Sequence, residues 1–394
     1  MVQFVLANRI KWLEKGVGYD RMLRWHKFNG KLALVTVLVH PGLVFFGPLF
    51  QAGVSPSEFL EYFTFGYWYG EVAFLLMIVI VGTTLYAHKI KLDYERWRWV
   101  HRLVYVIIVL GFMHSFAIGS DVNLQYEGQL FWYWATLAAI SLYAIFYRYI
   151  WRPLQFRKSR YVVDKIIQET KNVRSFYLKP KSGKRLDYAP GQFAFTKIYS
   201  DNLSNEEHHF TLSSSTNWDN SSFSIKESGD YTSELGKVKE GDEFHIEGPY
   251  GVCSNVGMRG PFVMIAGGIG ITPIMSMLRS ADRTFAGKVP KTLLVYANKT
   301  QADVAFKDEL EQMAQDADWL DIAYVYSDDE VEGTHHGYVT KEVLEEEIKN
   351  SDFDISASSF FLVGPPPMMN AVEKALLSLG ARKGHIFTER FALR

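Results

Sequence analysis

The chain has 394 residues and a formal net charge of −1, a balance that gives no basic surface for a nucleic acid partner. Its single cysteine, Cys253, excludes a disulfide within the chain and fits a reducing compartment. Residues 1–25 carry basic side chains without a long apolar core, which excludes a secretory signal peptide. The length is enough for two or three domains.

Four apolar stretches in the first 150 residues are long enough to cross a bilayer, which takes about 20 mainly apolar residues. They cover residues 31–50, 70–87, 101–119 and 131–150. Buried helices of a soluble protein could imitate one such stretch, but four in succession with flanking Trp and Tyr favour a membrane domain. We therefore expect a transmembrane helical bundle in a lipid bilayer.

The charges of the connecting loops predict how these helices are oriented. Lys and Arg are frequent in residues 88–102 and after residue 148, whereas residues 51–70 and 116–130 contain neither. By the positive-inside rule, both termini and everything after the last span face the cytoplasm. The chain is thus expected to be an integral protein of the cell membrane.

The sequence pattern changes after Arg160. Residues 161–255 show short alternating runs with turn signals, typical of a small antiparallel barrel. From residue 258, apolar strand-like runs alternate with helical patterns, typical of a Rossmann-like α/β domain with a parallel sheet. The predicted fold is multidomain: a helical transmembrane domain (1–155), an antiparallel β-barrel (156–256) and an α/β domain (257–394).

Four histidines lie in the predicted spans, where ionisable side chains are costly. His26 and His40 are fourteen residues apart in one span, and His101 and His114 are thirteen apart in another, so both separations are about 20 Å. Because the two helices run in the same direction, His26 matches His101 in depth and His40 matches His114. Facing imidazoles at two depths suit two stacked b-type haems, each with two histidine ligands.

The spacing carries a geometric condition and an alternative. Thirteen residues leave His114 about 140° from the helix face of His101. That helix must therefore distort, for which Gly111 is a candidate, or the haem planes must be rotated. A single histidine in a membrane is more often a hydrogen-bonding residue between helices, but two matched pairs favour haem. Two histidine ligands leave no open position on iron, so the expected chemistry is electron transfer.

Two segments of the predicted barrel are suited to a flavin. Thr211 and Ser213, at a strand end, could supply hydroxyl donors near the N5 and O4 atoms of the ring. Further on, a basic side chain and a turn with free amides and hydroxyls suit a pyrophosphate. These residues are Lys226, Gly229, Thr232 and Ser233. Together they indicate FAD.

A glycine run after an apolar strand indicates a dinucleotide. Glycines at a strand–helix turn let backbone amides approach the phosphates. The residues concerned are Gly267, Gly268, Gly270, Thr272 and Pro273. A second loop closes another strand and supports the same interpretation through Gly364, Pro365 and Met368.

With these motifs in place, the chain resembles the ferric reductase-like transmembrane family, which includes the NADPH oxidases and the membrane ferric-chelate reductases. The two histidine pairs match that family's haem ligands in spacing and order. His208-x-Phe210-Thr211 is similar to its His-Pro-Phe-Thr flavin motif, with His209 in place of proline. Residues 267–273 resemble the nicotinamide loop, and residues 364–368 the C-terminal Cys-Gly-Pro motif.

The resemblance implies further site residues, together with departures from the family pattern. Glu389 and Phe391 match a C-terminal segment whose aromatic ring covers the flavin, although three residues follow Phe391 here. Val363 stands at the cysteine of the Cys-Gly-Pro motif. Lys299 stands where NADPH-preferring members often have arginine, which favours NADPH but leaves NADH open. The family usually has six spans, so two helices are either missing from this sequence or absent in nature.

The resemblance implies a path for electrons from NAD(P)H through FAD and both haems. The inner haem would lie on His26 and His101, and the outer haem on His40 and His114. The final acceptor would be a ferric chelate or dioxygen, the latter giving superoxide. An alternative is a relay that feeds a membrane or periplasmic redox protein. A channel or sensor would suit the helices alone, but the flavin and nicotinamide motifs argue against it.

Overall fold

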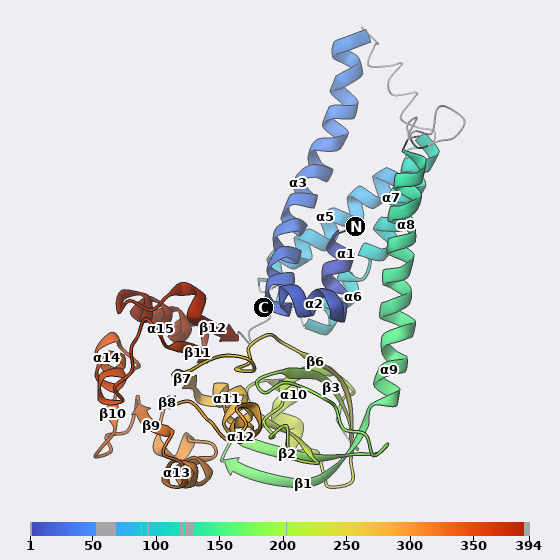
Figure 1. Cartoon of the computed structure of the whole chain (residues 1–394). Helices are drawn as coiled ribbons and strands as arrows, with labels where there is room; N and C mark the ends of the chain where they lie inside the picture. Colours follow the sequence, from blue (N-terminus) through green and yellow to red (C-terminus); the bar gives the residue numbers. More distant parts are fainter. Residues whose placement is uncertain are drawn as a thin grey trace. The chain divides into compact units, whose positions relative to one another are not determined.

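A computed structural model describes residues 2–52, 68–87, 89–92, 94–118, 122, 130–201 and 203–389 (Figure 1). The chain forms two compact units. The helical unit contains Met1–Arg9 and Met22–Ile150. The two-sheet unit contains Ile10–Arg21 and Trp151–Arg394, so a short N-terminal segment belongs with the C-terminal part of the chain.

Helices lie at all four predicted spans. They are α3 (Tyr19–Ala52), α5 (Trp68–Tyr86), α6 (Tyr94–His101) with α7 (Val104–Ile118), and α8 (Phe131–Phe146), preceded by α1 (Val2–Ala7). Two segments, Trp68–Tyr86 and Arg96–Ala117, are long and apolar enough to cross a membrane among the residues described. Their shares of buried residues are 6% and 0%, whereas a core helix of a soluble protein would be mostly buried. The apolar side chains thus face outward, as lipid requires.

The remaining two predicted spans differ in how their helices are built. α3 is a continuous helix of 34 residues, long enough to cross a bilayer on length alone. α8 has 16 residues and runs directly into a π-helical turn, η1 (Tyr147–Trp151), and then α9 (Arg152–Lys158). Helical backbone therefore continues past the predicted end of this span.

The helix that carries His101 and His114 is distorted, which is one of the two arrangements that the thirteen-residue spacing allows. α6 ends at His101 and α7 begins at Val104, with a turn at Arg102 and Leu103. Gly111, the predicted place for the distortion, lies inside regular α7, so that detail was wrong. The break next to His101 changes the direction of that side chain relative to His114.

Six antiparallel strands form the first sheet, in the order β4-β3-β6-β1-β2-β5. Their bounds are β1 (Arg160–Thr170), β2 (Val173–Pro180), β3 (Phe193–Tyr199), β4 (Glu207–Thr211), β5 (Ser221–Lys226) and β6 (Glu243–Tyr250). Alternate residues such as Phe176 and Leu178 of β2 are fully buried in a core with Phe223 and Phe244. This alternation is what a sheet with one buried face requires, and the antiparallel prediction is confirmed.

Six strands form the second sheet, in the order β10-β9-β8-β7-β11-β12, and every pairing between neighbours is parallel. They are β7 (Phe262–Gly267), β8 (Thr292–Asn298), β9 (Leu320–Tyr326), β10 (His335–His336), β11 (Ser359–Val363) and β12 (Ile386–Glu389). The longer crossover helices are α11 (Ile271–Arg279), α13 (Lys307–Asp316), α14 (Lys341–Asn350) and α15 (Pro366–Ser378) (Figure 1). The strand order reverses between β7 and β11, where open α/β sheets bind ligands. The predicted parallel sheet is confirmed.

Candidate functional site

The helical unit brings its four histidines together as two facing pairs. The ring centres of His26 and His101 are 6.2 Å apart, with an angle of 66° between the ring planes. Those of His40 and His114 are 6.3 Å apart, at 86°. The partners in each pair are the ones that matched in predicted depth.

These separations fit a haem iron between two imidazoles. Two metal–nitrogen bonds of about 2 Å each, extended to the ring centres, give a separation of about 6 Å. Each pair supplies two nitrogen ligands, and the macrocycle of a haem supplies the rest. Ligand type and spacing therefore agree with one haem for each pair.

His26 has a second interaction that orients its ring. Its Nδ1 atom lies 3.3 Å from the carbonyl oxygen of Gln3, so Nδ1–H donates to that oxygen and Nε2 is left for a metal. The Gln3 amide also donates to the carbonyl of His26, at 2.8 Å. A Cβ atom on Gly30 would come within 2.9 Å of this amide, so glycine there makes room for it.

His114 is fixed in another way, by close packing against α5. A Cβ atom on Gly70 would lie 2.7 Å from two atoms of the His114 ring. Real side chains do not approach so closely, so α5 can pass this imidazole only because residue 70 is glycine. One histidine of each pair is thus held by an element other than α3 or α7.

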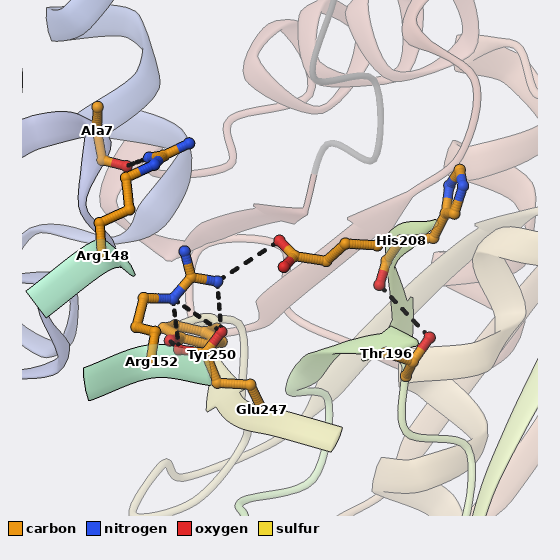
Figure 2. A network of polar contacts seen from close by, with 8 residues as sticks. Ala7, Arg148, Arg152, Thr196, His208, Glu247 and Tyr250 are labelled. Atoms are coloured by element: carbon orange, nitrogen blue, oxygen red, sulfur yellow. Dashed lines mark hydrogen bonds and ion pairs between the residues drawn. The ribbon is translucent and has the colours of Figure 1, made fainter. Parts of the chain in front are cut away.

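The predicted flavin strand is β4, at the edge of the antiparallel sheet. The centre of the His208 ring lies 4.0 Å from that of Tyr231, and the two rings are stacked. The His208 carbonyl accepts a hydrogen bond of 3.5 Å from the Thr196 hydroxyl, and Figure 2 draws this contact. The Phe210 ring lies nearly parallel to that of His208, 6.2 Å away. Thr211 ends the strand and is buried. Two flat rings and a hydroxyl at one strand end are the groups that a flavin ring would need.

Ser213 is placed differently from its prediction as a flavin donor. Its hydroxyl lies 3.0 Å from that of Ser222 and 2.9 Å from that of Ser224, and the Ser213 side chain is fully buried. These serines share hydrogen bonds within the protein. Thr211 is therefore the better candidate for a hydroxyl at the flavin.

The predicted phosphate-binding groups come together only in part. Lys226, at the end of β5, places its amine 4.0 Å from where a Cβ atom of Gly268 would be, so it reaches the glycine loop. The amides of Ser228 and Gly229 both donate to the Thr232 hydroxyl, at 2.9 and 3.0 Å. Ser233 follows in the short helix α10 (Asp230–Ser233). Two amides of this turn thus already have a hydrogen-bond acceptor within the protein.

The two glycine-containing loops lie against each other at the reversal of the strand order. A Cβ atom on Gly267 would come within 2.6 Å of the Met368 sulfur and 2.8 Å of Pro365. The Cα atom of Gly267 lies 3.2 Å from where a Cβ atom of Gly364 would be. Gly268 has a φ of +53°, which favours glycine. A ligand at the carboxyl end of β7 can therefore lie close to the backbone of Gly267 and Gly268.

The helix after the glycine loop begins with residues that also serve its own structure. Thr272 is buried, and its hydroxyl donates to the carbonyl of Ile269 at 3.1 Å. Pro273 lies in the first turn of α11, where proline is tolerated because its missing amide has no helical partner. A Cβ atom on Gly270 would come within 2.4 Å of the Val363 carbonyl oxygen. These contacts fix the loop next to β11.

Lys299 follows β8, and an acidic segment is bonded to it. The carbonyl of Lys299 accepts the amide of Asp328 at 2.8 Å. The amide of Gln301 donates to the Asp329 carboxylate at 2.7 Å. The loop that carries Asp328 and Asp329 is therefore bonded to the turn that carries Lys299.

Arg279 is a residue that the sequence did not single out. It donates to the Ser213 carbonyl at 2.6 Å and to the Glu309 carboxylate at 2.7 Å. Its guanidinium also lies 4.9 Å from the Trp218 ring centre and 4.8 Å from that of Phe306. It joins the loop after β4 to α13 of the parallel sheet. Nothing in the local pattern around residue 279 indicates these distant partners.

The C-terminal motif is only partly described. Glu389 ends β12 and is buried, with a carboxylate oxygen 3.5 Å from where a Cβ atom of Gly251 would be. Phe391 lies outside the described residues. The part of the motif that is visible therefore approaches the end of the barrel strand β6.

Comparison with protein families matches three descriptions in sequence order. Residues 1–112 match the ferric reductase like transmembrane component, residues 165–254 an FAD-binding domain, and residues 264–374 an oxidoreductase NAD-binding domain. Each of the two cofactor-binding matches falls on one of the two sheets.

Individual relatives match part of the chain. Flavohemoprotein B of Dictyostelium discoideum is 29% identical over 266 residues, which are 59% of this chain and 58% of the relative. NADH-cytochrome b5 reductase 1 of Debaryomyces hansenii is 36% identical over 160 residues, 40% of this chain and 55% of the relative. The chain thus spans little more than half the length of these relatives.

A solved structure agrees with the fold of this part. The FAD/NAD-binding domain of nitric oxide dioxygenase from Vibrio cholerae is 28% identical, with a TM-score of 0.53. The match covers 59% of this chain and 97% of that domain.

Proposed function

We propose that this chain, whose three matches are to a ferric reductase like transmembrane component, an FAD-binding domain and an oxidoreductase NAD-binding domain, carries electrons across a membrane from NAD(P)H through FAD and two b-type haems. The chain is an NAD(P)H-dependent oxidoreductase with FAD- and NAD-binding domains. The observation that carries the transmembrane step is the pair of facing histidines at each of two positions, with ring separations of 6.2 and 6.3 Å.

In this proposal each haem is held by one residue of α3 and one of the α6–α7 segment. His26 and His101 hold the inner haem, and His40 and His114 the outer one. A haem with two histidine ligands supplies one-electron transfer with no open position on the iron. Gln3 keeps the Nε2 atom of His26 available as a ligand, because its carbonyl occupies Nδ1.

The two-sheet unit is proposed to hold the other two cofactors. His208, Phe210 and Thr211 contact the FAD ring, and Lys226 neutralises phosphate charge next to the glycine loop. The amides around Gly268 and the close packing of Gly267 on Gly364 admit a nicotinamide dinucleotide to the end of β7. The other proposed contacts are Ser213, Gly229, Thr232, Ser233, Gly270, Thr272, Pro273, Lys299, Pro365 and Met368. Glu389 and Phe391 are proposed from the family resemblance to lie at the flavin.

The surroundings of Lys299 favour NADH over NADPH. Lysine meets a 2′-phosphate as a single charge, without the two-pronged geometry of arginine. The loop of Asp328 and Asp329 is bonded to the same turn. In our proposal, the two negative charges of this loop oppose the binding of a 2′-phosphate there. Carboxylates suit the 2′-hydroxyl of NADH. The preference expected from Lys299 alone is therefore reversed in our proposal.

The proposed acceptor is a ferric chelate or dioxygen on the side away from the cytoplasm. Electrons would leave through the edge of the outer haem, since neither histidine pair leaves an open position on the iron. In this proposal both termini and the two-sheet unit lie in the cytoplasm, at the cell membrane, as the loop charges indicate. A relay to a redox protein is the second candidate, and slow turnover with both small acceptors despite rapid haem reduction would favour it.

An anaerobic absorption spectrum of the detergent-purified protein with FAD tests the proposal, before and after NADH or NADPH is added. Sharp low-spin b-haem bands should appear after flavin reduction, faster with NADH. The proposal fails if protein expressed with ample haem contains none, or if the flavin bleaches without a haem signal.

A further inference from the structure

The chain passes from one unit to the other three times, after Arg9, after Arg21 and after Ile150. The segment between the first two crossings is Ile10–Arg21, and α9 begins just after the third. Residues from both segments contact one short piece of the barrel, residues 247–251, which we name the β6 end. This convergence involves residues far apart in sequence.

The N-terminal segment holds the β6 end through two polar contacts. The Lys11 amine donates to the Gly248 carbonyl at 2.8 Å, and the Gly251 amide donates to the Glu14 carboxylate at 2.8 Å. Both side chains belong to helix α2 (Lys11–Val17). Glu14 is 2% exposed, and burial raises the pKa of its carboxyl. A buried carboxylate is costly, so its presence needs a reason beyond solubility.

Tyr19 adds an apolar contact next to these two. Its ring centre lies 6.0 Å from that of Phe193, 5.7 Å from Phe195 and 6.5 Å from Tyr250. Tyr19 is also the first residue of α3, the helix that carries His26 and His40. Within the two-sheet unit, the first residue of α3 is therefore packed against three aromatic rings of the antiparallel sheet.

The third crossing is fixed by a buried ion pair, drawn in Figure 2. Arg152 donates to both oxygens of Glu247, at 3.0 and 2.6 Å, and the Tyr250 hydroxyl donates to the same carboxylate at 2.7 Å. Arg152 is the first residue of α9, which follows α8 after the π-helical turn. Arg152 is thus bonded to the same strand end as Lys11 and Glu14.

The β6 end is also next to the proposed flavin strand. Phe193 of β3 is the register partner of both Tyr250 in β6 and Thr211 in β4. A shift of the β6 end would therefore be passed across one strand to Thr211. Loose surface contacts would have no such connection.

We propose that Glu14 and Arg152 are positioning residues for electron transfer out of the flavin. They fix the β6 end, and through it the flavin strand, to the chain segments that enter and leave the haem-binding helices. This inference rests on the function proposed above. Loss of either anchor slows reduction of the haems and leaves hydride transfer from NADH to the flavin intact.

Stopped-flow absorption of the full-length protein, reduced anaerobically with NADH, separates the two steps. In Glu14→Ala, we expect flavin bleaching within about twofold of the wild type and haem reduction about tenfold slower, because small displacements cost rate steeply. Glu14→Gln keeps an oxygen that accepts the Gly251 amide, so haem reduction should return to within about threefold. A matched control is Lys181→Met, which removes an exposed ion pair with Glu243 at the other end of β6.

Several results would overturn the inference. Haem reduction as fast in Glu14→Ala as in the wild type would do so, as would equal slowing of flavin and haem reduction. Equal rates in Glu14→Ala and Glu14→Gln would also count against it. If Glu14→Ala does not fold, Lys11→Met removes the bond to Gly248 and a charge near Glu14, leaves the Glu14 contact with Gly251, and must slow haem reduction alone. Failure of the proposed function looks different, because the wild type itself would then show no haem reduction.

Discussion

The two units use apolar side chains in opposite ways. In the helical unit, Leu75 of α5 is 61% exposed and Val109 of α7 is 53% exposed, while histidines face each other in two pairs. In the two-sheet unit, Phe176 and Phe244 are fully buried in a closed core. The difference follows from the solvent, because lipid accepts apolar surface that water rejects.

This contrast shows where each unit places its polar chemistry. A membrane helix tolerates an ionisable group only when a partner or ligand meets it, so the histidines mark the site directly. In the two-sheet unit, polar groups occur throughout, and loops at strand ends carry the candidate site. Function is therefore easier to locate by composition in the helices and by topology in the sheets.

The largest expected effect is the loss of a haem. His101→Ala removes one ligand of the inner pair, and we expect about half of the haem absorbance to be lost and haem reduction by NADH to stop. His335→Ala is a control, because this histidine lies in the parallel sheet, where it contacts Glu347. Full haem content in His101→Ala, measured by the pyridine haemochrome spectrum, would contradict the assignment.

The next effect is confined to the two-sheet unit. Arg279→Ala removes charged hydrogen bonds to the Ser213 carbonyl and to Glu309, and since the Glu309 side chain is 36% exposed and can be hydrated, the cost should be about 1.5–3 kcal/mol. Thermal unfolding followed by release of FAD fluorescence should show a large decrease in midpoint. Haem absorbance should persist to the wild-type temperature.

An exposed ion pair of α13 provides the control for this change. Lys307 and Glu311 are one helical turn apart, with 3.6 Å between their charged atoms. Lys307→Ala should change stability by less than about 1 kcal/mol, as is usual for such pairs. Similar losses in Lys307→Ala and Arg279→Ala would mean that Arg279 is not a specific link between the two sheets.

A smaller effect concerns the choice of dinucleotide. Replacing Asp328 and Asp329 together with serine removes two carboxylates from the loop that is bonded to the Lys299 turn, so kcat/KM for NADPH relative to NADH should rise about tenfold. Asp318→Ser is the control, because Asp318 precedes β9 at the opposite end of that strand. An unchanged ratio would exclude these carboxylates as determinants of the preference.

A local change at the outer histidine pair should be smaller still. Gly70→Ala places a methyl group 2.7 Å from the His114 ring, which must then shift. We expect a displaced midpoint potential for one of the two haems, read by redox titration. Gly82→Ala lies on the same helix with nothing within 4 Å of the added carbon, and should leave both potentials unchanged. Identical titrations for the two variants would argue against this contact.

Much of the fold could be predicted from the sequence because it depends on local patterns. Apolar stretches and alternation with turn signals indicated the helices and both kinds of sheet. The spacing of His101 and His114 predicted either a distorted helix or rotated haem planes, but the place of the distortion at Arg102 and Leu103 depends on packing around the turn.

The site was less predictable where long-range contacts decide. The Ser213 hydroxyl shares hydrogen bonds with Ser222 and Ser224. These two serines belong to β5, and they lie near Ser213 only because the fold brings β5 beside the loop that follows β4. Glu14 meets Gly251 across 237 positions of sequence, a separation that no local motif encodes. A pattern read within one segment identifies candidate groups, but the partners that occupy them are set by the tertiary fold.

The smallest predicted effect is a pH dependence at Glu14. Burial raises the pKa of this carboxyl above its value in the unfolded chain, and the nearby charges of Lys11 and Lys15 only partly offset this. The folded state therefore binds the proton more tightly. Its contribution to stability is fully present below the unfolded pKa and is lost as the pH rises through the folded pKa.

Glu14→Gln has no charge to bury and should lack this dependence. Its thermal midpoint should exceed that of the wild type most at pH 7, and the difference should shrink as the pH falls toward the ordinary carboxyl range. Midpoints in detergent from pH 7 to about pH 5 measure this directly. A difference that stays constant over that range would mean that Glu14 is ionised at no cost. The contact with Gly251 would then be that of an ordinary, well-solvated carboxylate, and α2 would be a much weaker anchor than its burial indicates.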